Sequence, residues 1–226
     1  FIYIYMKSNK QIKNKNKIKK FRKMKGGGIN EDLFKSITEG SIDEVNSLLE
    51  KVDINVNDKD GYTPLHFACI NGHTEIAKLL IEKMAVLNVQ DKKGYTPLHV
   101  ACIKSHTEIA MVLIEKGADV NICDKNGCTP LHYACYFNGN TEVVMALIDK
   151  GAVLNVQDIN GVTPLHCACI KNHTEIAMVL INKDADVNAI DQNGNTPLHH
   201  ALRKGHAEVA MACLLYTSPS PRDRNV

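Results

Sequence analysis

The chain has 226 residues, a formal net charge of +2 and only 5% aromatic residues, with no tryptophan. No apolar run approaches the ~18 residues needed to span a bilayer, so we expect no membrane span. The charge is uneven, because residues 1–25 carry ten Lys/Arg and no acid while residues 26–212 carry 15 basic and 24 acidic residues, a net of −9. An acidic body argues against a nucleic-acid duplex as partner.

Residues 1–25 are built mainly from Lys, Asn, Ile, Tyr and Phe. Like charges without apolar periodicity predict a segment that does not pack. Two interpretations stay open: translated upstream sequence, with Met6 or Met24 as the true start, or a basic disordered arm. The lysine run also matches the loose pattern of a nuclear-localisation signal.

Beyond Gly26–Gly28, apolar residues at helical spacing predict two short helices at 31–38 and 42–50. Ser41 stands where its hydroxyl can cap the second of them. This pair lacks the motif that follows. We therefore interpret residues 29–57 as a divergent first unit that covers the apolar end of a stack.

A nine-residue string, Gly-Tyr-Thr-Pro-Leu-His-Phe-Ala-Cys at 61–69, recurs four more times along the chain. Its threonines are spaced by 33, 33, 34 and 33 residues and are Thr63, Thr96, Thr129, Thr163 and Thr196. A fixed period of this size indicates stacked supersecondary units. We place the units at 58–90, 91–123, 124–157, 158–190 and 191–215, with the last one truncated.

Each unit follows one plan, which the first copy illustrates. The Asp58-Lys59-Asp60-Gly61 segment predicts a tight turn, because Asp accepts backbone amides and Gly tolerates positive φ. Thr63 then caps a short helix with Pro64 in its first position. A second, amphipathic helix is predicted from Thr74.

The second helices are expected to end at a residue in the left-handed conformation. Gly117 and Gly151 adopt it readily, whereas Met84 and Asp184 hold the same place at a cost of about 1 kcal/mol each. The third unit carries one extra residue, which we place in the loop between its helices, at 136–140.

The Thr-Pro-Leu-His-x-Ala string, followed by His-Thr-Glu-Ile-Ala and Gly-Ala-Asp-Val-Asn, resembles the ankyrin repeat over residues 31–212. The resemblance implies an all-α solenoid of stacked helix-turn-helix units with short β-hairpin turns. It implies a protein-binding module that is intracellular, cytoplasmic or nuclear, with no cofactor, no metal and no obligate oligomer. It also implies that the motif histidines are structural braces.

Ten histidines and eight cysteines raise the question of a metal or catalytic site. Stacked units lie ~10 Å apart, too far for one column of side chains to share a zinc ion. The column Cys69, Cys102, Cys135 and Cys169 is interpreted as buried, unpaired thiols, which fit a reducing compartment. Cys123 and Cys128 flank one hairpin turn and are the only pair that we consider for a disulfide bridge. No catalytic motif is present, so we predict that the chain is not an enzyme.

The string from Cys213 to Asp223 reads as a translation of the transposon-end adapter attached to DNA fragments for sequencing. We expect residues 213–226 to be non-native and the reading frame to continue beyond Ala212. A natural Ser/Pro-rich tail is the alternative. Leu214 and Leu215 are expected to extend the last helix, with disorder from Ser218.

Three functions remain. The first is a non-catalytic scaffold that binds a protein or peptide on the concave face of the stack. The second is the targeting arm of a larger enzyme or secreted effector whose catalytic domain lies beyond the C-terminus. The third is a substrate for asparagine hydroxylation, which the resemblance suggests at Asn88, Asn121, Asn155 and Asn188.

The predicted binding surface is an exposed apolar stripe on the concave face. It joins the residues after the turn glycines to residues near the ends of the first helices, with tyrosines as anchors. Lysines, including Lys92 and Lys93, are expected to favour an acidic or mixed peptide. The predicted contact residues are Tyr62, Ile70, Tyr95, Ile103, Lys104, Cys128, Tyr136, Phe137, Val162, Ile170 and Lys171.

Overall fold

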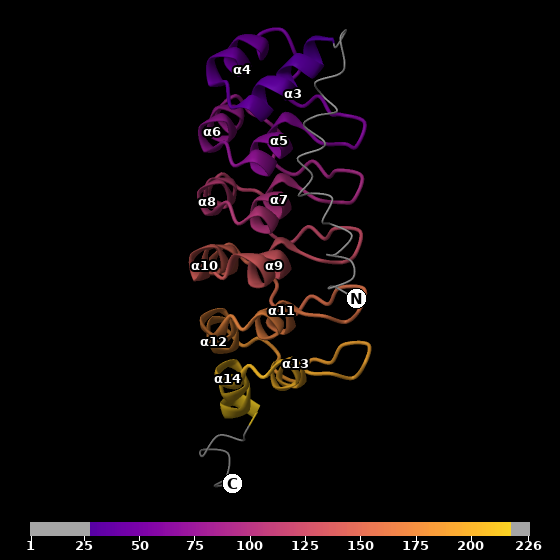
Figure 1. Ribbon diagram of the computed structural model, residues 1–226, viewed down its shortest axis with the longest axis vertical. Coiled ribbons are helices and arrows are strands. Elements are labelled where there is room, and N and C mark those ends of the chain that lie inside the picture. The colour runs from indigo at the N-terminus through magenta and orange to yellow at the C-terminus, as the bar shows by residue number, and fades with distance from the viewer. Residues whose placement is uncertain (1–27, 218–226) are drawn as a thin grey trace.

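The computed structural model describes residues 28–217, and Figure 1 shows them as a single stack of helix pairs. The predictions for residues 1–27 and 218–226 lie outside the described residues. Residues 28–217 form helices and turns and contain no β-strand. The all-α solenoid is therefore confirmed.

The first pair is α3 (Ile29–Glu39) and α4 (Ile42–Leu48), as predicted for the divergent unit. Each of the five motif repeats then has a first helix and a second helix. In chain order these are α5 (Pro64–Asn71) and α6 (Thr74–Glu82), α7 (Pro97–Lys104) and α8 (Thr107–Glu115), α9 (Pro130–Tyr133) with the π-turn η2 (Ala134–Asn138) and α10 (Thr141–Asp149), α11 (Pro164–Lys171) and α12 (Thr174–Asn182), and α13 (Pro197–Lys204) and α14 (Ala207–Thr217).

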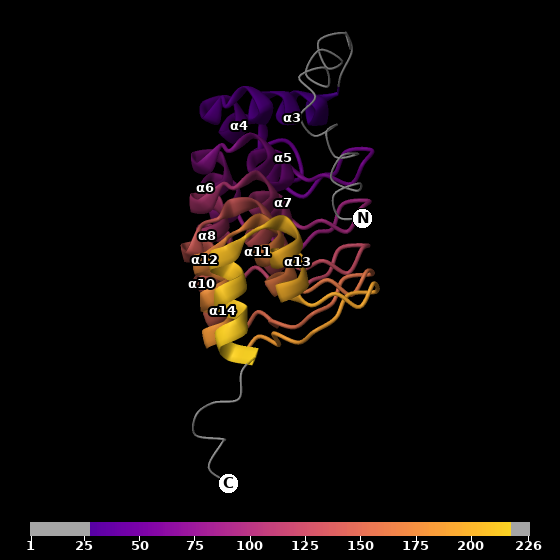
Figure 2. The same ribbon diagram turned by 60° about the horizontal axis from the view of Figure 1, so that its bottom comes forward.

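The helices stand in two columns. Figures 1 and 2 show the first helices in one column, the second helices in another, and the Asp-x-x-Gly loops projecting from the far side of the first helices. We call these loops fingers. Each finger is a turn closed by two main-chain bonds, such as the Asp58 N–H to the Tyr62 carbonyl and the Gly61 N–H to the Asp58 carbonyl, both at 3.0 Å. Between fingers, the Lys92 N–H donates to the Asp60 carbonyl of the preceding finger at 2.9 Å.

Capping by the motif works as predicted. The Thr63 hydroxyl oxygen accepts the His66 N–H at 3.4 Å, while His66 Nδ1 accepts the Thr63 N–H at 3.1 Å. Pro64 is the first residue of α5. The same reciprocal pair begins α7, α11 and α13. The motif thus satisfies the orphan amides of a helix start with its own side chains.

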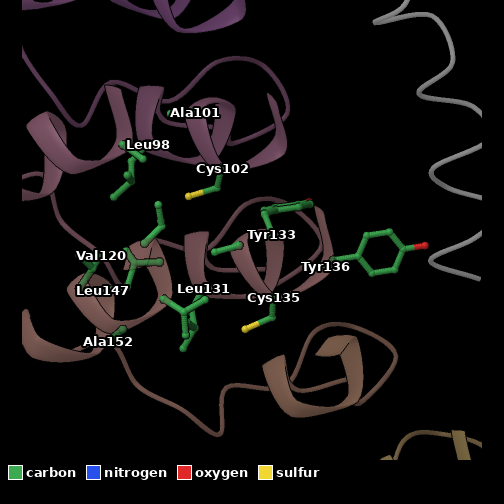
Figure 3. Close-up of a cluster of buried hydrophobic side chains, with 14 of the residues drawn as sticks. Leu98, Ala101, Cys102, Val120, Leu131, Tyr133, Cys135, Tyr136, Leu147 and Ala152 are labelled. Atoms are coloured by element: carbon green, nitrogen blue, oxygen red, sulfur yellow. The ribbon is translucent and has the colours of Figure 1, made fainter. Parts of the chain in front are cut away.

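The core runs along the seam between the columns. Leu65, Ala68 and Cys69 are buried against neighbouring repeats, and the other three motif cysteines are fully buried as well. Figure 3 shows Leu98 and Cys102 in one layer between successive repeats, and Leu131 and Cys135 in the next layer. A continuous seam of this kind replaces a central core, as solenoids require.

Left-handed residues end the second helices where predicted. The φ angles are +88° at Gly117 and +84° at Gly151, and also positive at Met84 (+68°) and Asp184 (+66°). Leu214 and Leu215 lie within α14, which confirms that they extend the last helix.

Two local predictions are wrong. Ser41 stands at the N-terminus of α4, but its hydroxyl makes no capping bond, since its ψ is 83° whereas the capping Thr63 has an extended ψ of 167°. The extra residue of the third repeat is not loop. It is absorbed inside the first helix as the π-turn Ala134–Asn138, because widening one turn accommodates an insertion without breaking the helix.

Candidate protein-binding face

The residues predicted to form the stripe divide into two groups. Tyr62, Ile70, Ile103, Lys104 and Ile170 are half-buried, while Lys171 and Phe137 are exposed, the latter at 37%. The other four are buried, with exposures of 2%, 8%, 6% and 6% for Tyr95, Cys128, Tyr136 and Val162. The expectation that these four are exposed is wrong.

Tyr95 shows why the position after the turn glycine turns inward. Its ring lies edge-on to Tyr133 at 5.8 Å and 6.1 Å from the ring of His99. The chain at this point leads from the finger into the capped helix, so the side chain enters the seam with the next repeat. Cys128, one repeat later, likewise points its thiol at Asp158 Oδ2 of the following finger, at 3.9 Å.

Tyr136 belongs to the π-turn and points away from Leu131 and Leu147 (Figure 3). Its ring meets Phe137 at 5.0 Å in an edge-on contact, and Lys171 Nζ lies 4.5 Å from the ring centroid. Tyr136 therefore supports its two exposed neighbours instead of standing clear as an anchor.

Sequence reasoning missed Tyr133, the residue after the motif histidine. Its hydroxyl donates to Asp124 Oδ2 at 2.6 Å, and its ring stacks on Phe137 with centroids 6.3 Å apart. Burial raises the pKa of the Tyr133 phenol far above its usual range. Variation at this position (Phe67, Val100, Tyr133, Cys167, His200) was the signal that could have found it.

The motif histidines link successive repeats. His66 Nδ1 accepts a main-chain N–H, so Nε2 carries the proton and donates to the Tyr95 carbonyl at 2.9 Å. His99, His132 and His166 bond the next repeat in the same way. Burial lowers the pKa of all four, that of His99 to about 4. They are neutral braces, as the resemblance implied.

The last repeat carries a different pair. His200 Nε2 lies 2.9 Å from Asp191 Oδ2, and an Arg203 guanidinium nitrogen lies 3.0 Å from His200 Nδ1. Burial alone would raise the pKa of Asp191, but hydrogen bonds from Asn195, His200 and Asn193 hold it at about 2. The carboxylate therefore serves the finger turn and is not a general acid.

Three of the asparagines considered for hydroxylation hydrogen-bond one repeat to the next. The side-chain oxygens of Asn88, Asn121 and Asn155 each accept a main-chain N–H from the following repeat, and the donors are Asp119, Val153 and Asp186 at 3.0, 2.9 and 2.9 Å. These amides have a structural role that sequence spacing did not reveal.

The cysteines form no disulfide among the described residues. Cys123 is exposed while Cys128 is buried toward Asp158, so the pair considered for bridging points apart. Sequence reasoning missed a contact between Cys169 and Cys213, whose sulfurs lie 3.6 Å apart. Within residues 28–217, no three His, Cys, Asp or Glu side chains gather to hold a metal ion, and no helix is long and apolar enough to cross a membrane.

Stacked helix pairs, fingers and reciprocal Thr–His caps define a helical-repeat protein without a central core. A family model described as ankyrin repeats (3 copies) matches residues 33–124, 84–158, 118–191 and 138–223. The chain belongs to the ankyrin-repeat family. Ankyrin repeats are generally protein–protein interaction modules.

Three similar proteins show how widely this unit is used. The chain is 44% identical over 55 residues to alpha-latrocrustotoxin-Lt1a of Latrodectus tredecimguttatus, covering 24% of this chain and 4% of the toxin. It is 40% identical over 53 residues to human ankyrin repeat domain-containing protein 7, covering 23% and 21%. It is 40% identical over 52 residues to palmitoyltransferase akr1 of Schizosaccharomyces pombe, covering 22% and 8%. The chain thus spans less than a quarter of the length of each.

Proposed function

We propose that this chain is a non-catalytic scaffold that binds a protein or peptide on its finger face. The finger face comprises the fingers and the outward sides of the first helices. The general role of the family supports this proposal, and so does an aromatic cluster in the middle of the stack.

Phe137 carries the argument. It is a large apolar side chain with 37% exposure, placed by the π-turn in the central repeat. Tyr133 and Tyr136 pack against it on two sides, at 6.3 and 5.0 Å, and the Asp124 carboxylate holds Tyr133 in place. An exposed aromatic ring on a rigid base is the kind of residue that dominates interface energetics. Single π-helical turns inside α-helices are also frequent at functional sites.

The surroundings of Phe137 suggest the chemistry of the partner. Ile103 and Ile170 lie half-buried at the ends of the neighbouring first helices, and Lys104 and Lys171 follow them. Because Lys171 rests over the Tyr136 ring with its side chain still exposed, its charge remains available to a carboxylate. The preferred partner is a peptide with an apolar residue for Phe137 and acidic residues on either side.

A displayed random-peptide library tests the proposal. Selection on the full chain should give peptides with an apolar residue flanked by Asp or Glu. Phe137→Ala should weaken a selected peptide about tenfold or more, since hot-spot truncations cost 2 kcal/mol or above. Val153→Ala, an exposed position in the same repeat, is the matched control and should leave binding unchanged. Equal binding by both variants would place the site elsewhere.

The second candidate function is the targeting arm of a larger enzyme or secreted effector. A palmitoyltransferase and a toxin, of which the chain matches 8% and 4%, favour it. Sequencing of the genomic locus across codon 212 tests it. A downstream catalytic domain in the same reading frame would support this function, and a stop codon directly after one last repeat would contradict it.

A further inference from the structure

The second helices carry a regular surface of their own, on the side of the stack away from the fingers (Figure 1). The fifth residue of each second helix forms a column that is Lys78 in the first repeat and methionine afterwards. Three of the methionines are large exposed side chains, at 47%, 46% and 56% for Met145, Met178 and Met211, and the fourth, Met111, is half-buried. We call these four residues the methionine stripe.

Acidic residues border the stripe on both sides. Three positions before the methionines stand four exposed glutamates, Glu108, Glu142, Glu175 and Glu208. Four positions after them stand Glu115 and Asp149 in the second and third repeats, both exposed. Residues three and four apart share one face of a helix, so each methionine lies next to carboxylates of its own helix. Within the same repeats, the lysines nearest in sequence to the methionines, such as Lys116, come five positions later and point to another side of the helix.

The first repeat shows which chemical group fits between these carboxylates. Lys78 Nζ bonds Glu75 of its own helix at 3.0 Å and Glu108 of the next repeat at 2.8 Å. In the later repeats a methionine takes the place of this lysine. Within the part of the chain that the structure describes, no lysine or arginine bridges Glu142, Glu175 or Glu208. Glu208 accepts the Thr174 hydroxyl at 3.4 Å, whereas Glu142 and Glu175 flank Met145 as Glu75 and Glu108 flank Lys78. The gap between Glu142 and Glu175 therefore has the same sequence spacing as the one that Lys78 fills.

We propose that the methionine stripe binds a basic amphipathic helix that lies along the stack axis. Stacked repeats are ~10 Å apart, the spacing of packed helices. An α-helix rises about 10.5 Å in seven residues, so one apolar residue per heptad meets one methionine per repeat. Lysines or arginines beside that apolar residue then bridge successive glutamates, as Lys78 does. Flexible methionines suit such a surface, because they adapt to the side chains that pack on them.

Charge separates this partner from two others. A second copy of the chain, joined through the same stripe, would bring the glutamate columns against each other, and facing like charges cost several kcal/mol. An anionic lipid surface would be repelled by the same carboxylates. An exposed apolar stripe with an acidic border is therefore matched by a cationic helix.

A synthetic peptide of three heptads tests the proposal with the full chain. It carries Leu once per heptad, Lys at the flanking positions and Ala elsewhere, with a fluorophore for anisotropy titration. One control peptide has the same composition with the leucines moved out of heptad register, and the other has Glu in place of Lys. Both control peptides should bind at least about tenfold more weakly than the first peptide. Binding of the first peptide should itself weaken with added salt, because salt screens the charges.

Variants of the chain locate the site. Met145→Ser with Met178→Ser, and separately Glu142→Lys with Glu175→Lys, should each weaken the peptide about tenfold or more. Lys78→Met lengthens the stripe by one repeat and should strengthen binding. Met84→Ser is the matched control, an exposed methionine outside the stripe, and should change nothing. Circular dichroism checks that each variant is folded.

Three outcomes would overturn the proposal. The first is equal binding of all three peptides, and the second is unchanged binding by both double variants. The third is self-association of the chain that Met145→Ser with Met178→Ser abolishes, which would make the stripe an interface between copies. Phe137→Ala should leave this peptide bound, so failure here and failure of the finger-face proposal are separate results.

Discussion

The interior repeats and the last described repeat carry the same motif in different surroundings. Leu98 and His99 in the second repeat are both 0% exposed. Their counterparts in the fifth repeat differ, since Leu198 is half-buried and His199 is exposed. His199 still bonds the Thr196 hydroxyl at 2.8 Å, yet among residues 28–217 it has no carbonyl of a following repeat to bond.

This difference separates local from non-local effects. The reciprocal Thr–His cap forms in both places, because it needs only residues three apart. Burial of the leucine and the histidine needs the next repeat. Stability in such a stack is therefore largely a property of the interfaces between neighbours.

The largest effect should come from removing the motif leucine in the interior. Leu98→Ala deletes a fully buried side chain and should cost about 3–5 kcal/mol of unfolding free energy. Leu198→Ala, at a half-buried site, should cost less than half as much. Urea denaturation of both variants measures the difference, and equal losses would mean that the end repeat is packed as tightly as the interior.

The second-largest effect should come from acidification, which we expect to destabilise the interior repeats. An unfolded histidine has a pKa near 6.5, whereas burial lowers that of folded His99 to about 4. Between these values the unfolded chain binds more protons, so stability is complete above pH 6.5 and falls toward pH 4. His99 alone accounts for about 3 kcal/mol at full effect.

Urea titrations at pH 7.5, 6 and 5 measure this loss. His99→Asn, which removes the titrating group, should be less stable at pH 7.5 but should lose less on acidification. A free energy of unfolding that stays constant from pH 7.5 to 5 would contradict the prediction.

The finger glycines offer a closely matched comparison. Both Gly94 and Gly194 have positive φ, at +85° and +74°. An added Cβ at Gly94 would meet Lys125 N at 2.8 Å, whereas at Gly194 it would meet nothing within 4 Å. Gly194→Ala should cost about 1 kcal/mol for the left-handed backbone alone. Gly94→Ala should cost about 1–3 kcal/mol more, because two backbones must move apart.

Thermal unfolding of the two glycine variants gives the comparison. Equal shifts in melting temperature would show that neighbouring finger backbones move apart at little cost and that their close stacking contributes little to stability.

The smallest effect tests a purely local cost. Met84 is 83% exposed and has a φ of +68°, so its side chain gains little from burial while its backbone is strained. Met84→Gly should stabilise the chain by about 1 kcal/mol. Gly117→Ala, at the equivalent place in the next repeat, should destabilise the chain by a similar amount, because alanine is strained at a φ of +88°. No steric clash adds to this cost, since nothing lies within 4 Å of an added Cβ there. A destabilised Met84→Gly would show that the methionine makes contacts that matter.

Much of the fold could be predicted because its signals are local and repeat. The 33-residue period, the capping threonines and the positive φ at Met84 all follow from short-range chemistry. The candidate site was less predictable. Half-buried Ile103 and exposed Phe137 were correctly expected to reach the surface, while Tyr95 was not recognised as buried.

The sequence by itself determined the period, the helix starts and the fully buried cysteine column, because each depends on residues within one turn or on a strict repeat. Only the tertiary structure decided that the extra residue becomes a π-turn, since a loop and a widened helix satisfy the chain equally well until Tyr133 and Phe137 stack. It also decided that the Tyr95 ring turns away from solvent and packs against Tyr133 of the next repeat. Contacts between repeats join residues about 30 positions apart, and no local pattern encodes their direction.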